Sequence, residues 1–140
     1  VRQAITDLST ALDKAIRKSS HGWDRIESIV KRVFRLANNR PELLGLLREV
    51  TRLGPPVLTY AVDGIRPLLE GATMWLAEEM KAGRVRKSDP ELLVLSAYST
   101  IMGAATEVKL FEALGEESTI RDVAIRRQEL LRFLKIALIP

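Results

Sequence analysis

The chain has 140 residues, of which 46% are hydrophobic and 29% charged, a composition typical of one packed domain and not of a disordered segment. No apolar run approaches the ~18–20 residues that a membrane-spanning helix needs, and Val1 opens an amphipathic segment instead of a secretory signal. The absence of cysteine excludes disulfides and thiolate chemistry, and it fits the cytoplasm, where we expect the protein to work without contacting a membrane.

The net charge of +4 does not by itself predict binding to nucleic acid. Basic residues are spread along the chain at helical intervals and are mixed with acidic ones, so they form no dense positive stripe. We therefore expect no direct DNA contact by these residues.

The first three helices are predicted by apolar periodicity and by the residues that interrupt it. Residues 2–18 form an amphipathic pattern with Ile5 on its apolar face, and residues 24–37 form a second one. Pro41 then opens a short, leucine-rich helix over 41–53, because proline at the first helical position lacks an N–H group that would be unpaired there anyway.

Three longer helical segments follow the Gly54-Pro55-Pro56 break. The first runs to about Ala82 and stops at Gly83, with a bend and candidate hinge at Pro67, which removes one helical hydrogen bond. The second covers 90–114, and the last runs from a cap at Ser118-Thr119 to about Leu138. No segment alternates apolar and polar residues as a strand would. The sequence thus predicts one all-α domain over 1–140, a bundle of about six helices.

The last two helices carry more apolar surface than one buried face needs. In 90–114, a bulky stripe is backed by a second stripe of small or apolar residues, and the final helix also has two apolar sides. We therefore expect a homodimer through a four-helix interface, two helices from each chain. The alternative is that both helices lie at the centre of a monomeric bundle. The candidate interface residues are Ser96, Ser99, Gly103, Thr106, Leu110, Val123, Arg127, Leu130 and Leu134.

The sequence offers little for catalysis or metal binding. Its one histidine, His21, is expected to be solvated in a loop, and the pair Glu78-Glu79 is expected to be solvated charge. Nucleophile elbows, phosphate-binding loops and dinucleotide-binding glycine patterns are absent. We expect neither an enzyme nor a cofactor or metal.

A helical bundle can instead enclose a small molecule in an apolar cavity with a few polar anchors. Aromatic, sulfur-containing and polar side chains are concentrated on the segments that would surround such a cavity. Each is also compatible with an ordinary core or surface position. The candidate ligand-binding residues are Phe34, Tyr60, Asp63, Arg66, Glu70, Met74, Trp75, Tyr98 and Met102.

Two stretches resemble the C-terminal domain of the tetracycline-repressor (TetR) family. Residues 40–49 (RPELLGLLRE) look like the short helix of that domain, and residues 81–92 (KAGRVRKSDPEL) look like its loop between the long ligand helix and the first dimer helix. The order of short helix, long helix, loop and two terminal helices is also similar over nearly the whole chain. The helix-turn-helix part of the family is not in the sequence.

The resemblance implies an effector-binding and dimerisation domain of a transcriptional regulator, with repression as the expected mode. Residues 1–18 would then be the remnant of the helix that connects to a missing DNA-binding domain, through which alone DNA is bound. A small apolar or amphipathic effector would shift the conformation of the domain and so control DNA binding. The alternative is a helical protein–protein adaptor domain without a small-molecule ligand. A third and weaker alternative is a di-metal or cofactor bundle enzyme, for which the sequence lacks ligands.

Overall fold

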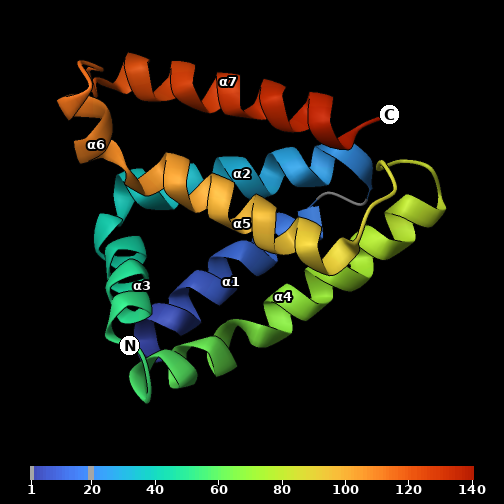
Figure 1. The fold of residues 1–140 in the computed structure, drawn as a ribbon, viewed down its shortest axis with the longest axis horizontal. Coiled ribbons are helices and arrows are strands. Elements are labelled where there is room, and N and C mark those ends of the chain that lie inside the picture. Colours follow the sequence, from blue (N-terminus) through green and yellow to red (C-terminus); the bar gives the residue numbers. More distant parts are fainter. Residues whose placement is uncertain (1, 19–20) are drawn as a thin grey trace.

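The computed structural model describes residues 2–18 and 21–140, and this part of the chain contains helices but no strands (Figure 1). The prediction of an all-α bundle is therefore confirmed. The helices are α1 (Arg2–Lys18), α2 (Gly22–Asn39), α3 (Pro41–Leu53), α4 (Val57–Lys81), α5 (Pro90–Thr106), α6 (Val108–Ala113) and α7 (Ile120–Leu138).

The starts of α3, α5 and α7 are set by local signals seen in the sequence. α3 and α5 both begin on a proline, and the Asp89 side chain accepts a hydrogen bond from the Leu92 N–H at 3.1 Å to cap α5. α7 begins with a capping box in which Thr119 and Asp122 each accept a backbone N–H from the other. Gly83 follows α4 with a positive φ of 78°, as expected for a residue that ends a helix.

The predicted helix over 90–114 is instead divided at Glu107, whose φ and ψ of −84° and 37° leave the helical range. A partner from another helix accompanies the break. Arg48 of α3 donates to the Thr106 hydroxyl at 3.1 Å and forms an ion pair with the Glu107 carboxylate. Because Arg48 lies 59 positions away from Glu107, no local pattern could have shown this break.

The bundle is organised around α2 and α5. α1 packs against α2, α3 and α4, while α5 contacts α2, α3, α4 and α7. In Figure 1, α7 runs along one edge of the molecule and α4 along another, with α2 and α5 between them. The core between these elements contains Val30, Leu44 and Val85, each at most 1% exposed.

A smaller core lies where α1 meets α3 and α4, and contains Ile5, Val50, Ala61 and Ile65. Helices α1 and α4 approach closely there: a Cβ atom added to Gly64 of α4 would lie 2.6 Å from Ile5 Cγ2 of α1.

In the described part of the chain, no helix combines the length and apolar character required to cross a membrane.

Candidate functional site

A cavity with a volume of about 330 Å³ lies chiefly between α2, α4 and α5. This volume is at the lower end of the range for small-molecule sites, roughly 300–1,000 Å³. Its walls are mostly aliphatic and include Ile26, Ile29 and Val33 of α2, Ile65, Leu68, Leu69, Ala72 and Leu76 of α4, and Leu93, Val94, Ala97 and Ile101 of α5. Such walls suit an apolar ligand, because its transfer from water would be favourable.

Among the described residues, the polar side chains that line this cavity are Asp13, Arg25, Trp75 and Tyr98. The Arg25 guanidinium lies over the Trp75 ring, 4.7 Å from the ring centroid. Burial lowers the pKa of Arg25, an effect opposed by the charge of Glu79, and burial raises the pKa of the Tyr98 hydroxyl. Both shifts indicate that the groups are withdrawn from water, where an added hydrogen bond contributes most to binding.

Three of the predicted ligand-binding residues, Trp75, Tyr98 and Met102, line the cavity, as does the candidate hinge Pro67. The other six do not. Phe34 is buried in the core, whereas Tyr60, Asp63, Arg66, Glu70 and Met74 are exposed on α4, where Asp63 pairs with Arg66 at 3.7 Å.

The predicted ligand-binding residues of α4 that are exposed lie on one side of the helix, and a different side of α4 lines the cavity. Ile65, Leu69, Ala72 and Leu76 are spaced by three or four residues, so helical periodicity alone could have identified that face. Arg25 was missed because a single arginine among many in an amphipathic helix carries no signal of burial.

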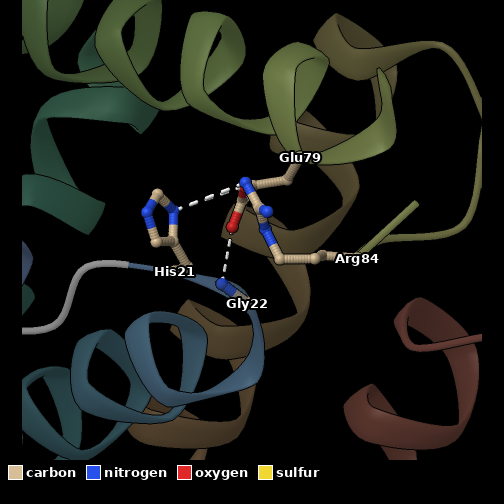
Figure 2. Close-up of polar contacts among 4 residues, drawn as sticks. All are labelled: His21, Gly22, Glu79 and Arg84. Atoms are coloured by element: carbon tan, nitrogen blue, oxygen red, sulfur yellow. Dashed lines mark hydrogen bonds and ion pairs between the residues drawn. The ribbon is translucent and has the colours of Figure 1, made fainter. Parts of the chain in front are cut away.

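A second polar cluster joins the start of α2 to the end of α4 (Figure 2). The Glu79 carboxylate is 1% exposed and accepts hydrogen bonds from the Gly22 backbone N–H at 2.5 Å and from Arg84 Nε at 2.8 Å. The backbone carbonyl of Glu79 also accepts from the Arg84 N–H at 3.0 Å. We call this arrangement of Glu79, Gly22 and Arg84 the Glu79 clamp.

The expectation that Glu78-Glu79 is solvated charge is wrong for Glu79 and right for its exposed neighbour Glu78. The Glu79 carboxylate occupies the amino end of α2, where free N–H groups and the helix dipole favour a negative charge. The His21 side chain is 62% exposed, as expected for a loop, although its Nδ1 lies 3.6 Å from the Glu79 carboxylate. The clamp therefore fixes α2 to α4 beside the cavity wall formed by Arg25 and Leu76.

The Glu79 clamp predicts that the free energy of unfolding depends on pH in the acidic range. Burial would raise the pKa of Glu79, but hydrogen bonds from Arg84 and Gly22 together hold that pKa below its ordinary value of 4.5. A group with a depressed pKa in the folded state stabilises the fold above its unfolded pKa, and that contribution disappears as the pH falls through the folded value.

We expect Glu79→Gln to be less stable than the unmodified chain near neutral pH, and the difference to shrink steadily below the ordinary carboxyl pKa. Urea unfolding across this range, followed by circular dichroism, measures it. A stability difference that stays constant down to strong acid would show that ionised Glu79 does not stabilise the fold.

The candidate dimer residues fall on two kinds of surface. Ser96, Ser99 and Leu110 are exposed, Gly103 and Thr106 are half-buried, and a Cβ atom added to Gly103 would meet nothing within 4 Å. This face of α5 and α6 is open and could accept a second helix.

The α7 stripe is placed differently. Leu134 is 4% exposed, Val123 and Leu130 pack against the same core, and Arg127 is half-buried. The outward side of α7 is formed instead by other apolar residues, of which Phe133 is 60% and Ile136 70% exposed. Any interface through α7 would therefore use these residues in place of Leu134, because Leu134 is already enclosed by its own chain.

Groups of three or more histidine or acidic side chains that could hold a metal ion are not found among the described residues.

Comparisons with known proteins bear on the fold. No family model matches the chain, and no curated protein is similar in sequence. Among solved structures, the chain is similar to a protein of unknown function from Rhodococcus sp. RHA1, with a TM-score of 0.71 and 20% sequence identity over 94% of this chain and 68% of that one. At this level of identity the likeness supports the helical fold alone.

Proposed function

We propose that the chain is the effector-sensing and dimerisation domain of a TetR-like transcriptional regulator that acts as a repressor in the cytoplasm. The observation that carries the proposal is the aliphatic cavity of about 330 Å³ between α2, α4 and α5. A small apolar or amphipathic molecule bound there would favour one packing of the long helix α4 over another. The ligand shifts the equilibrium between these two packings only by as much as its affinities for them differ.

The contact between α4 and α1 would transmit such a change in the packing of α4 from the cavity to α1. Ile65 and Pro67 line the cavity, and Gly64 on the same turn of α4 touches Ile5 of α1. Arg2 Nε further donates to the Tyr60 hydroxyl of α4 at 2.8 Å. A shift of this part of α4 would move α1, the helix that would lead to a DNA-binding domain.

The homodimer is also part of the proposal. Large exposed apolar side chains on α5, α6 and α7, and at Leu114 just after α6, leave an uncovered surface that a second copy of the chain would bury. These side chains are Leu92, Leu95, Leu110, Leu114, Ile120, Ile125, Phe133 and Ile136. The same surface favours the second candidate function, a helical adaptor that binds a different protein and no small molecule.

Binding of a neutral apolar probe tests the cavity. We expect 1-decanol to bind the unmodified chain and to raise its melting temperature, because a ligand at about one hundred times its Kd stabilises by ~2.7 kcal/mol. Hydrogen exchange should slow in α2, α4 and α5 and also change in α1. Isothermal titration calorimetry, thermal unfolding and exchange mass spectrometry provide the readouts.

The matched control is Ala97→Trp, which fills the cavity without altering the exposed apolar surface, since Ala97 lines the cavity wall. This variant should lose decanol binding. Equal binding by both proteins would place decanol on the outer surface and favour the adaptor function, whereas binding without a change in α1 would contradict the proposed relay.

A further inference from the structure

The position of Arg25 restricts which molecules suit the cavity. Its guanidinium is half-buried at the cavity wall and rests on the Trp75 ring. Among the described side chains, it forms neither a hydrogen bond nor an ion pair. A guanidinium presents five N–H donors in a planar fork, so Arg25 keeps its donors available for a ligand.

The surrounding charges compensate the positive charge of Arg25 only in part. Glu79 is the carboxylate whose charge acts on Arg25, but that carboxylate already accepts hydrogen bonds from Arg84 and from the Gly22 N–H. Asp13, the other charged residue of the cavity wall, is exposed to solvent. Its charge is therefore hydrated and screened, whereas Arg25 is partly withdrawn from water.

We propose that the ligand of this cavity is an amphipathic acid, whose carboxylate is bound by Arg25 and whose hydrocarbon body lies against the aliphatic walls of α4 and α5. The inference rests on the proposed function, because it names the class of effector for the same cavity. The planar fork of Arg25 matches the two oxygens of a carboxylate. Leu69, Ala72, Ala97 and Ile101 line the space that the hydrocarbon body would fill.

Three probes of equal chain length separate the contribution of charge from that of apolar contact: decanoate, 1-decanol and decylammonium. Near neutral pH, decanoate is ionised and decylammonium is protonated. We expect decanoate to bind about tenfold or more tightly than decanol, as a hydrogen bond to a charged group implies, and decylammonium to bind most weakly. Isothermal titration calorimetry below the micelle concentration of each probe measures the three affinities.

Arg25→Gln should reduce decanoate affinity about tenfold or more and reduce decanol affinity much less, because only decanoate loses an opposite charge. Arg25→Lys should keep part of the preference, since it retains the charge but not the fork. Arg35→Gln is the matched control: Arg35 is exposed on the same helix and does not line the cavity, so decanoate should bind this variant as it binds the unmodified chain.

The outcomes distinguish this inference from the function on which it rests. If decanol binds in the cavity as tightly as decanoate, or if Arg25→Gln leaves decanoate binding unchanged, the cavity binds ligand but the inference of an acid is wrong. Tighter binding of decylammonium than of decanoate would overturn the inference of an acid and would indicate that the cavity binds a cation at Asp13. If none of the three probes binds, the proposed effector function fails together with the inference. The preference of the unmodified chain remains a test even if Arg25→Gln does not fold.

Discussion

Arginine in place of Gly103 is expected to prevent the proposed homodimer from forming and to leave the chain monomeric. Gly103 lies on the open face of α5 between Ser99 and Thr106, and a Cβ atom there meets nothing within its own chain. In a close helix–helix interface the new side chain would bring an unpaired charge out of water, which costs several kcal/mol and raises the dimer Kd about a hundredfold or more. Native mass spectrometry at micromolar concentration should show the chain mass of 15.7 kDa for the variant and twice that mass for the unmodified chain.

Gly45→Arg is the matched control for this experiment. Gly45 also lies inside a helix, is exposed on α3, and has nothing within 4 Å of an added Cβ atom. Both variants gain helix propensity of roughly 1 kcal/mol. A difference between their oligomeric states is therefore due to the position of the new arginine and not to the replacement of glycine by arginine. A Gly103→Arg chain that keeps the dimer mass would remove this face of α5 from the interface, and a monomeric unmodified chain would move the adaptor function to first place.

Loss of the Glu79 carboxylate is expected to destabilise the fold strongly. In Glu79→Ala, the Gly22 N–H and Arg84 lose their partner in a position that is 1% exposed. Breaking a fully buried, hydrogen-bonded ion pair costs ~3–5 kcal/mol. The Arg84 side chain is 44% exposed and can turn into solvent, so we expect a loss at the lower end, about 3 kcal/mol. The melting temperature should fall by roughly 10 °C for a domain of this size.

Glu78→Ala tests the same substitution one residue earlier. Glu78 is exposed, so its replacement should change stability by less than about 0.5 kcal/mol. Calorimetric unfolding of the two variants gives a direct comparison. Similar losses of stability would mean that the Glu79 clamp contributes nothing beyond ordinary surface charge.

The helix boundaries were predictable where the deciding residues are neighbours in the chain. The start of α3 at Pro41 and the capping of α7 by Thr119 depend on proline and hydroxyl groups acting within one turn. The burial of Glu79 was not predictable, because its partner Gly22 is 57 positions away and an isolated glutamate resembles any solvated one. The interruption at Glu107 likewise depends on Arg48 from a different helix.

The sequence predicted a cavity between helices, but only some of the residues that line it. Bundle architecture indicated a cavity near the long helix, and Trp75, Tyr98 and Met102 line it. Tyr60 and Met74 have side chains suited to ligand binding, but they lie on the side of α4 that faces solvent. The side of a helix that faces a cavity depends on how neighbouring helices pack, and single-residue chemistry does not carry that information.

The Glu79 clamp has a mechanical consequence for the proposed sensing. It ties α4 to α2 near Leu76, whereas the other end of the same cavity wall, at Ile65 and Pro67, is linked to α1 through Gly64. We expect α4 to respond to a ligand as a lever whose pivot is the tied end. Displacement would then grow with distance from the pivot and be largest where α1 rests on it, so a small expansion at the cavity centre would be amplified at the amino end of the domain.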